Sequence, residues 1–312
     1  MKVSVKVPAT SANIGPGFDT MGVAFPLYNT VTIEETVLPG SGVTIELVSD
    51  FDYKDKALLE HVPVDETSII YKAVELLYNS IGQTPSELKI TVDSKIPMTR
   101  GLGSSSSVIV GALIAANELL GRPADEAALL SIATEIEGHP DNVAPAILGG
   151  MLFASLQDDG SVVYKKLPWP DEWKITACVP DFELSTEVAR SVLPKEVPMK
   201  DAIFNGQRMA MFIDAVHTRD AATMKFALQD RLHQPYRMNL MPGLAQIMHD
   251  LKFEEHVLGC VISGAGSTIL LITESAGTER AKSIVRKIWN DLNVNVEMYD
   301  FPVDTAGAQV IV

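Results

Sequence analysis

The chain has 312 residues, of which 46% are hydrophobic, so it can bury one large core or two smaller ones. Its formal net charge of −15 at pH 7 argues against nucleic acid or an anionic membrane as a partner, because both require surfaces rich in Lys and Arg. The two cysteines are far apart, with no Cys-x-x-Cys pair and no histidine-rich tract, so a zinc site and a disulfide framework are both unsupported.

The first residues alternate between polar and apolar, which predicts a strand over residues 3–7 that ends at the following proline. They lack the apolar block of a signal peptide, and the longest apolar run, 108–116, is too short to cross a membrane, so we expect a cytoplasmic protein. A turn-rich loop then carries two isolated polar residues, Asn13 and Asp19. They can form simple Asx turns, but loops with amide and carboxylate groups between strands are often binding sites.

Apolar spacing predicts strands and helices along the rest of the chain. Strands are expected at residues 29–35, 43–47, 88–93, 149–156, 175–179 and 294–299. Helices are expected at residues 67–81, 108–120, 124–136, 199–219, 221–232, 242–251 and 276–290. Residues 50–64 are expected to form an acidic surface segment, and Thr186 to cap a short helix. Strand and helix runs mixed in this way predict an α+β protein.

A composition shift at residues 157–171, where Asp-Asp-Gly is followed by Pro-Trp-Pro-Asp, predicts a crossover between domains. We therefore expect an N-terminal domain over residues 1–160 and a C-terminal domain over residues 161–312. A glycine-rich turn at 262–268 lies between two predicted strands of the second domain. Alone it is weak evidence for a site, because glycine turns between strands are common.

The stretch 97–107 is the most informative part of the sequence. It reads Pro-Met-Thr-Arg-Gly-Leu-Gly-Ser-Ser-Ser-Ser and joins a predicted strand to a predicted buried helix. Glycines let the backbone approach a ligand, and a helix start offers free N–H groups and a positive dipole end, so the stretch suits a phosphate. It is neither a P-loop, which needs Gly-Lys-Ser/Thr, nor a dinucleotide fingerprint, which needs a third glycine where Ser106 stands. A simple helix cap is the plainer interpretation, but a cap needs only one serine.

Carboxylate, imidazole and amide side chains are concentrated between Glu135 and Asn142, where a predicted helix gives way to a predicted apolar strand. A solvated turn would explain any one of these residues. It explains the whole cluster poorly, because the flanking residues are strongly apolar. The segment is therefore a second candidate site.

Three stretches, in their order and spacing, resemble the three motifs of the GHMP kinases. They read Pro-Ala-Thr-Ser-Ala-Asn-Ile-Gly-Pro-Gly-Phe-Asp at 8–19, Pro-x-x-x-Gly-Leu-Gly-Ser-Ser at 97–105 and Ser-Gly-Ala-Gly-Ser at 263–267. Within this superfamily the chain is most similar to the homoserine kinases. That similarity rests on the first motif, on His-Pro-Asp-Asn-Val-Ala-Pro-Ala at 139–146, on Thr186-x-x-x-Arg190 and on Gln-Pro-Tyr-Arg at 234–237.

The resemblance covers nearly the whole chain and implies a two-domain GHMP kinase fold. It implies an N-terminal α/β domain like domain 2 of ribosomal protein S5, with a left-handed βαβ unit, and a C-terminal ferredoxin-like α/β domain, with the site between them. It further implies ATP-dependent phosphorylation of the side-chain hydroxyl of L-homoserine, a step of threonine biosynthesis, and suggests a homodimer. The alternatives are another GHMP small-molecule kinase, and a non-catalytic ATP-binding regulatory protein on the same fold.

The same resemblance assigns residues to the two substrates and to Mg²⁺. The ATP phosphates are expected at Pro97, Arg100, Gly101, Leu102, Gly103, Ser104, Ser105 and Ser106. Mg²⁺ prefers oxygen ligands and is expected on Ser105 and on Glu137, with Glu135 as the second choice. Homoserine is expected at Asn13, Asp19, His139, Asp141, Thr186, Arg190, Arg237 and Gly264. In this set the arginines suit the carboxylate and Asp141 suits the ammonium.

The expected catalytic residues are Asp141, Asn142 and Arg190. Mevalonate kinases have an aspartate base where Asn142 stands, and an amide does not usefully accept a proton. The hydroxyl proton therefore passes either directly to the γ-phosphate or to Asp141, and the sequence leaves both routes open. The chain also lacks the first-motif lysine of mevalonate kinases, and it has Ser-Ser-Ser-Ser where the family often has Ser-Ser-Ala-Ala.

Overall fold

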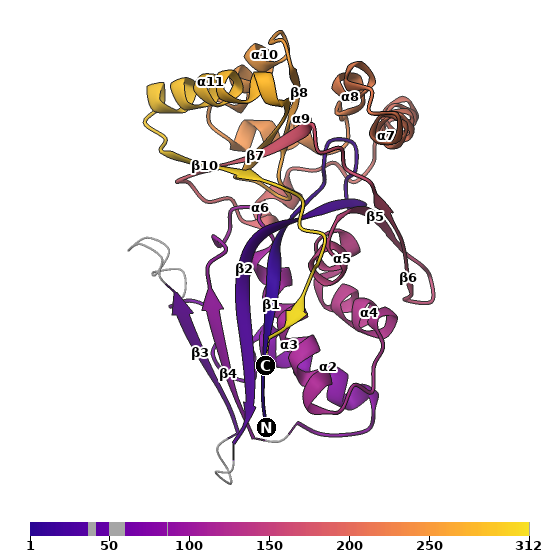
Figure 1. Cartoon of the computed structure of the whole chain (residues 1–312), viewed down its shortest axis with the longest axis vertical. Helices are drawn as coiled ribbons and strands as arrows, with labels where there is room; N and C mark the ends of the chain where they lie inside the picture. Colours follow the sequence, from indigo (N-terminus) through magenta and orange to yellow (C-terminus); the bar gives the residue numbers. More distant parts are fainter. Residues whose placement is uncertain (37–41, 50–59, 86, 312) are drawn as a thin grey trace.

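The computed structural model describes residues 1–36, 42–49, 60–85 and 87–311, which form two β-sheets with helices packed against them (Figure 1). Most of the expected acidic segment, residues 50–59, lies outside the described residues. The larger sheet comprises β1 (Lys2–Ala12), β2 (Met21–Glu35), β3 (Val43–Ser49), β4 (Leu88–Ser94), β5 (Met151–Leu156), β6 (Val162–Leu167) and β11 (Gln309–Val310). Its strands follow the order β11-β1-β2-β4-β3, with β5 paired to β2 and β6 paired to β5.

Helices α2 (Ile69–Ser80), α3 (Ser104–Leu119), α4 (Glu126–Glu137) and α5 (Pro140–Leu148) lie together on one side of the larger sheet (Figure 1). Side-chain caps define the starts of two of them, since Ser68 accepts the N–H of Ile70 and Asp125 that of Ala128. Helix α3 is buried along most of its length and contacts both β1 and β2. The start of α3 is therefore fixed by the core.

The smaller sheet comprises β7 (Trp173–Pro180), β8 (Val257–Ile262), β9 (Ile269–Glu274) and β10 (Val296–Phe301), in the order β10-β7-β9-β8 with every pair antiparallel. Helices α6 (Thr186–Ser191), α7 (Met199–Thr218), α8 (Ala221–Ala227), α9 (Gln234–Arg237) and α10 (Leu244–Leu251) lie between β7 and β8 in sequence, and α11 (Thr278–Asp291) lies between β9 and β10. This β-α-β-β-α-β order is the ferredoxin-like arrangement. Among the described helices, none has the length and apolar character needed to span a membrane.

The two sheets share a buried core, so the domains are packed into one body. Phe25 of β2 and Trp173 of β7 belong to the same buried cluster as Phe212 of α7. The chain crosses between the sheets after β6, which pairs with β5 in the larger sheet, so residue 160 falls in the turn of the β5–β6 hairpin. At its end the chain returns to the larger sheet, where β11 pairs with β1. Loops from both domains can therefore meet at a fixed junction.

Several local predictions differ from the structure, since β2 begins at Met21 rather than at residue 29 and α3 at Ser104 rather than at residue 108, and four further differences concern other elements. The first strand does not end at Pro8: β1 continues to Ala12, with a register shift between Pro8 and Ala9 where the missing proline N–H is tolerated. Residues 140–148 were not predicted to be helical but form α5, which proline can begin because its missing N–H has no role at the first helical position. Helix α8 ends at Ala227, five residues before the predicted end at 232. Ser185, rather than Thr186, caps α6.

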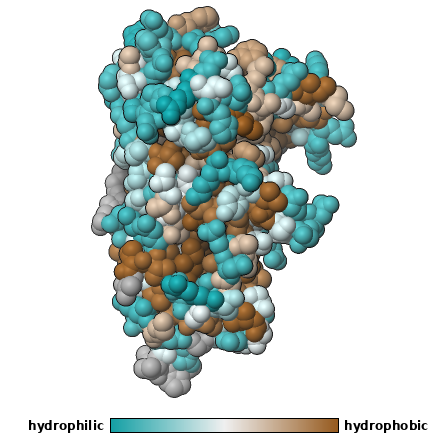
Figure 2. All heavy atoms as spheres, turned by 45° about the vertical axis from the view of Figure 1, so that its right-hand side comes forward, coloured by the Kyte–Doolittle hydropathy of each residue, from teal (hydrophilic) through white to brown (hydrophobic). Residues whose placement is uncertain are grey.

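Figure 2 shows the side of the molecule on which β6 and α4 lie, and there hydrophilic side chains interrupt the hydrophobic patches. The β5–β6 hairpin contributes two exposed hydrophobic residues to the surface of the protein, Leu156 and Val163. Single exposed residues of this kind are ordinary on a protein surface.

Candidate active site

The predicted phosphate loop joins β4 to α3, and its two glycines are required by their surroundings. Gly101 and Gly103 have φ angles of 75° and 68°. A Cβ atom on Gly101 would lie 2.1 Å from the carbonyl oxygen of Ser263, and one on Gly103 would lie 2.0 Å from Oγ1 of Thr10. Helix α3 starts at Ser104, and Gly103 has no side chain to cap it. The first N–H groups of α3 are therefore available to an anion.

The glycine-rich turn between β8 and β9 holds the phosphate loop from the other domain. The Ser263 hydroxyl donates to the carbonyl oxygen of Gly101 (2.6 Å), and the Thr268 N–H donates to that of Arg100 (3.1 Å). Inside the loop, Leu102 is buried, and the Arg100 guanidinium donates to the carbonyl oxygen of Met98 (3.3 Å). The predicted second and third motifs are thus brought into direct contact. Pro97 and Ser104 are partly exposed beside them.

The end of α4 faces the start of α3. The Ser106 hydroxyl donates to Oε1 of Glu137 (3.0 Å), whereas Ser105 and Glu135 are both exposed. Burial raises the pKa of Glu137, although the nearby His139 and the Ser106 hydrogen bond oppose the shift. The structure therefore brings Glu137, the first choice from sequence, next to the loop. The serine that contacts it is Ser106, one residue after the predicted Ser105.

The first turn of α5 supplies a buried carboxylate with a free oxygen. Asp141 is fully buried, and its Oδ1 is hydrogen-bonded to Nδ1 of His139. Its Oδ2 is buried without a hydrogen-bond partner among the described residues. Burial opposes protonation of His139, but the hydrogen bond and charge of Asp141 prevail and raise the pKa of His139. An unpartnered buried carboxylate oxygen is costly, which indicates a place for a donor from a ligand.

Asn142 lies between this acidic pair and the phosphate loop. Its Oδ1 accepts a hydrogen bond from the Thr10 hydroxyl (2.8 Å) and lies 3.2 Å from the position that a Cβ atom of Gly103 would take. With Oδ1 engaged, the amide nitrogen is the group that Asn142 can offer as a hydrogen-bond donor.

The loop between β1 and β2 carries Asn13 and Asp19 to the same place. Both oxygens of Asp19 accept from the Arg190 guanidinium, at 2.7 and 3.2 Å. The Asp19 N–H in turn donates to Oδ1 of Asn13 (2.7 Å), and Nδ2 of Asn13 donates to the carbonyl oxygen of Gly264 (3.1 Å). Burial opposes charging of Arg190, but its bonds to Asp19 raise its pKa. Thr186 lies exposed at the first residue of α6, one turn before Arg190.

Arg237 is the second predicted arginine, and it is almost completely buried. It is 1% exposed, and its Nε and Nη1 donate to the carbonyl oxygens of Ala189 (3.2 Å) and Gly264 (3.0 Å). Its Nη2 donates to none of the described residues. Burial and the neighbouring Arg190 lower the pKa of Arg237 to about 10, so the guanidinium is charged at neutral pH.

Two acidic residues and a histidine in this region are close enough to hold a cation. One ligand atom from each of Asp19, His139 and Asp141 lies within 4.8 Å of the others. However, both oxygens of Asp19 are occupied by Arg190, and an imidazole is a poor ligand for Mg²⁺. The pairing of Ser106 with Glu137 offers only oxygen ligands and lies at the phosphate loop.

Three residues that complete this geometry were not predicted. Thr10 orients Asn142, Phe18 lies 5.5 and 5.2 Å from the guanidinium carbons of Arg190 and Arg237, and His233 contacts Arg237. Thr10 and Phe18 belong to the first motif, so proximity to Asn13 and Asp19 was the available signal. His233 directly precedes the Gln-Pro-Tyr-Arg stretch but has no pattern of its own.

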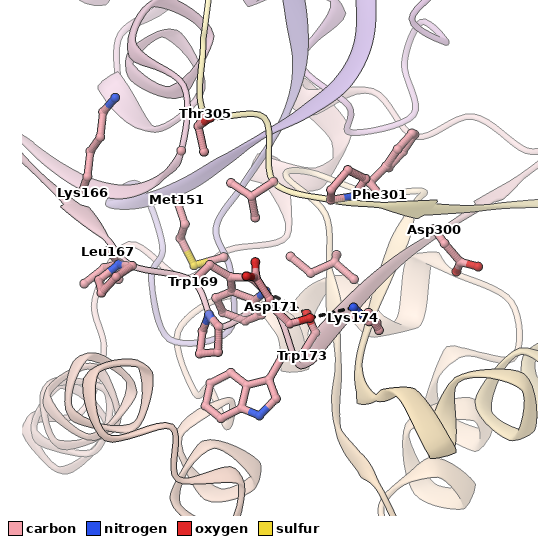
Figure 3. Close-up of a pocket in the computed structure, with 16 residues that line it drawn as sticks. Met151, Lys166, Leu167, Trp169, Asp171, Trp173, Lys174, Asp300, Phe301 and Thr305 are labelled. Carbon is pink, nitrogen blue, oxygen red and sulfur yellow. Dashed lines mark hydrogen bonds between the residues drawn. The ribbon is translucent and has the colours of Figure 1, made fainter.

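A separate cavity of about 640 Å³ lies between the β5–β6 hairpin and the smaller sheet (Figure 3). Its lining includes Met151, Trp169 and Trp173, but none of the predicted site residues. The ammonium groups of Lys166 and Lys174 already donate to the backbone carbonyls of Leu148 and Asp171. The residues predicted for phosphate and substrate binding therefore lie outside this cavity.

Comparisons with known proteins agree with this fold. The family model of the GHMP kinases N terminal domain matches residues 68–150, and that of the GHMP kinases C terminal domain matches residues 212–291. A mevalonate kinase structure covers 97% of the chain with a TM-score of 0.66, although only 15% of its residues are identical, and so supports the fold alone. The fold and the two family models together define a GHMP kinase.

Similar proteins identify one family within the GHMP kinases. The homoserine kinase of Synechocystis is 38% identical over 98% of this chain and 97% of its own length. That of Caldicellulosiruptor saccharolyticus is 43% identical over 87% of this chain and 84% of its own length. The crystal structure of the homoserine kinase from Cytophaga hutchinsonii has a TM-score of 0.85 and 27% identity, covering 99% of this chain and 97% of that one. The chain therefore belongs to the homoserine kinase family, which confirms the predicted resemblance and the predicted two-domain fold.

Proposed function

We propose that this chain transfers the γ-phosphoryl group of ATP to the side-chain hydroxyl of L-homoserine. The observation that carries the proposal is the buried, unpartnered Oδ2 of Asp141, which lies beside a phosphate loop and near two arginines. Such a site suits a small acceptor with both an ammonium and a carboxylate. Homoserine kinases among the relatives support the same substrate.

The ammonium of homoserine is assigned to Asp141. A carboxylate that is fully buried gains most from a cationic donor, since little water competes for it. The protonated form of His139 offsets part of the negative charge around it. If Oδ2 holds the ammonium, it cannot also remove the hydroxyl proton. The hydroxyl proton is then expected to pass to the phosphoryl group itself.

The carboxylate of homoserine is assigned to the two arginines. Nη2 of Arg237 has no acceptor among the described residues, and Arg190 is about one-third exposed, with both its terminal nitrogens already on Asp19. Asn13 and Asp19 support these groups through Gly264 and Arg190, and Thr186 borders them at the start of α6. The substrate is thus held at both charged ends, which leaves its hydroxyl to face the phosphate loop.

The triphosphate of ATP is assigned to the amides at the start of α3. Phosphoryl transfer depends mainly on positioning and on stabilising negative charge, and Asn142 contributes an amide donor next to this loop. Asn142 is not expected to act as a base.

Mg²⁺ is assigned to Ser106 and Glu137, because this pair combines a carboxylate with a hydroxyl at the start of α3. Burial of Glu137 makes its ionised form costly in the absence of a cation, which fits a metal ligand. The ion would neutralise charge on the phosphate oxygens when bound. Ser105, exposed at the preceding position of the helix, is assigned to phosphate rather than to metal.

The test is a coupled ADP-release assay with Mg²⁺ and ATP against L-homoserine, L-threonine, L-serine, mevalonate and galactose. Turnover that is strong with L-homoserine and weak with the others is the expected result. Turnover with mevalonate or galactose instead would retain the kinase and reject the substrate. Binding of ATP without turnover of any acceptor would support the regulatory alternative.

A further inference from the structure

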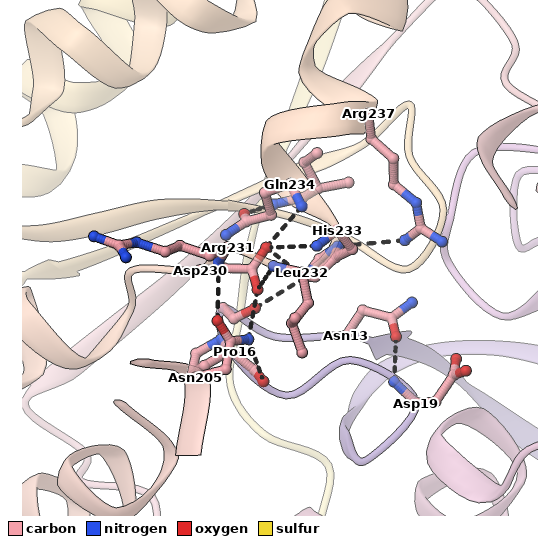
Figure 4. A network of polar contacts seen from close by, with 12 residues as sticks. Asn13, Pro16, Asp19, Asn205, Asp230, Arg231, Leu232, His233, Gln234 and Arg237 are labelled. Atoms are coloured by element: carbon pink, nitrogen blue, oxygen red, sulfur yellow. Dashed lines mark hydrogen bonds and ion pairs between the residues drawn. The ribbon is translucent and has the colours of Figure 1, made fainter. Parts of the chain in front are cut away.

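A buried polar network joins the β1–β2 loop to the segment before α9 (Figure 4). At its centre the side chain of Asp230 is completely buried and accepts four hydrogen bonds. Its Oδ1 accepts from Nδ2 of Asn205 and the N–H of Leu232, and its Oδ2 accepts from the N–H groups of His233 and Gln234. Asp230 therefore fixes the backbone at the start of α9, from which Arg237 projects.

His233, at the start of α9, connects two parts of the site through its two ring nitrogens. It is completely buried, and its Nε2 lies 2.9 Å from the carbonyl oxygen of Gly15, while its Nδ1 lies 3.4 Å from Nη1 of Arg237. A carbonyl only accepts and a guanidinium only donates, so Nε2 must carry the proton and Nδ1 must be free of one. Only one neutral tautomer of histidine satisfies both contacts.

Burial of His233 favours this neutral form on balance. Burial lowers the pKa of His233, and Arg237 acts in the same direction. The carboxylates of Asp230, whose Oδ2 is 3.6 Å from Nε2, and of Asp19 act in the opposite direction. The hydrogen bond to the Gly15 carbonyl also raises the pKa, but burial outweighs these effects, and the contact with Nη1 of Arg237 requires an unprotonated Nδ1.

The same network holds the β1–β2 loop at three points. His233 holds the carbonyl oxygen of Gly15, Nδ2 of Asn205 donates to that of Pro16 (3.3 Å), and the Phe18 ring stacks on the His233 ring with centroids 5.4 Å apart. The guanidinium carbons of Arg190 and Arg237 lie 5.5 and 5.2 Å from the centre of the Phe18 ring. The His233 ring and the Phe18 ring stacked on it thus link the position of the β1–β2 loop to that of Arg190 and Arg237.

We propose that His233 is a positioning residue for acceptor binding. Its Nε2–H fixes the loop that carries Asp19, and its Nδ1 holds Arg237 so that Nη2 faces the acceptor carboxylate. The inference rests on the proposed function, because it assigns the carboxylate of homoserine to Arg237. His233 does not itself touch the substrate.

The experiment compares His233→Phe with His233→Gln in the full-length enzyme. Phenylalanine keeps a ring against Phe18 but has neither nitrogen, whereas glutamine keeps a neutral donor and acceptor. We expect His233→Phe to raise the KM for L-homoserine about tenfold or more, as for loss of a hydrogen bond to a charged group, with the KM for MgATP changed less than about twofold. His233→Gln should recover most of this loss. Equal changes in both KM values, or a fall in kcat with unchanged KM for homoserine, would overturn the proposal.

Two further measurements separate positioning from a merely structural role. In an Arg237→Ala background, the same His233 substitutions should raise the KM for homoserine by a clearly smaller factor than in the wild-type background, because the part of their effect that passes through the guanidinium is missing. For linear aminopropanol, which is homoserine without its carboxylate, His233→Phe should lower kcat/KM by a clearly smaller factor than it does for homoserine. If the effects of His233 and Arg237 simply add, the proposal is wrong. If the wild-type enzyme does not phosphorylate homoserine, the proposed function fails first and this inference fails with it.

Discussion

Replacing Asp141 by asparagine keeps the shape of a fully buried side chain and removes only its charge. The free Oδ2 is assigned to the substrate ammonium, so Asp141→Asn should lower kcat/KM for homoserine. Breaking a buried, hydrogen-bonded charge pair costs about 3 kcal/mol, which corresponds to a loss of about a hundredfold. The KM for MgATP should change little, because Asp141 is not part of the phosphate loop.

The same substitution should not destabilise the unliganded protein. The unpartnered Oδ2 costs about 1–3 kcal/mol in the wild type, and this cost disappears with the charge. Against it, the bond to His139 loses its charge assistance, which is about 1 kcal/mol. The free energy of unfolding is therefore expected to be unchanged or slightly increased, and a thermal melt without ligands measures this directly.

Asp230 provides the matched control, since its side chain is equally buried but accepts four hydrogen bonds. In Asp230→Asn one oxygen becomes an NH₂ group that faces donors, so unfolding should become easier by about 2–4 kcal/mol. The two substitutions should thus change Tm in opposite directions or, at least, by clearly different amounts. A wild-type KM and kcat for homoserine in Asp141→Asn, or a loss of stability as large as that of Asp230→Asn, would refute the reasoning.

Four other substitutions test the rest of the site. Ser106→Ala should raise the KM for MgATP about tenfold through the loss of a contact to an ionised ligand. Ser105→Ala should change this KM less than about threefold. A larger effect of Ser105→Ala than of Ser106→Ala would identify Ser105 as the metal ligand instead. Gly103→Ala should reduce ATP affinity and destabilise the protein by about 1–3 kcal/mol, because the φ of Gly103 is 68° and the new Cβ would meet the Thr10 hydroxyl. A calorimetric titration that gives the wild-type affinity for ATP would contradict this prediction. The folded-state pKa of His139 is raised, so its charged form stabilises the protein fully below its ordinary value of 6.5, and this stabilisation is lost as pH rises through the raised value. The difference in Tm between wild type and His139→Gln should therefore shrink with increasing pH, and a difference that grows would show that the sign is wrong.

The sequence predicted most of the regular elements because their apolar residues recur with clear spacing. It did not predict α5, since that helix is apolar on nearly every side and contains two prolines, which hides both the helical period and the usual signs of its ends. Nor did it predict that β1 passes through Pro8, because tolerance of a proline depends on a register shift against β2 that local sequence does not encode.

The candidate site was predictable to the level of motifs, but not always to that of single atoms. Spacing alone cannot tell whether Ser105 or Ser106 faces Glu137, because the answer depends on how α3 is rotated against α4. His233 and Phe18 were missed for another reason. A buried histidine and an aromatic residue in a loop are usual parts of a core, and only the three-dimensional contacts with Arg237 distinguish them.

The two buried aspartates, Asp230 and Asp141, have different roles in the site: the first holds the backbone in place, and the second keeps an unpaired oxygen. Around Asp230 every buried oxygen is paired, so the segment that carries Arg237 is held in the absence of substrate. At Asp141 one carboxylate oxygen has no hydrogen-bond partner among the described residues. The free energy of folding therefore offsets the cost of this buried charge until a ligand pairs with it. A donor that enters this position gains the full strength of a buried ionic hydrogen bond without first displacing a protein group. Affinity for a small zwitterion then comes from the cost of Asp141 in the free enzyme, and the surrounding network prevents the site from relaxing to remove that cost.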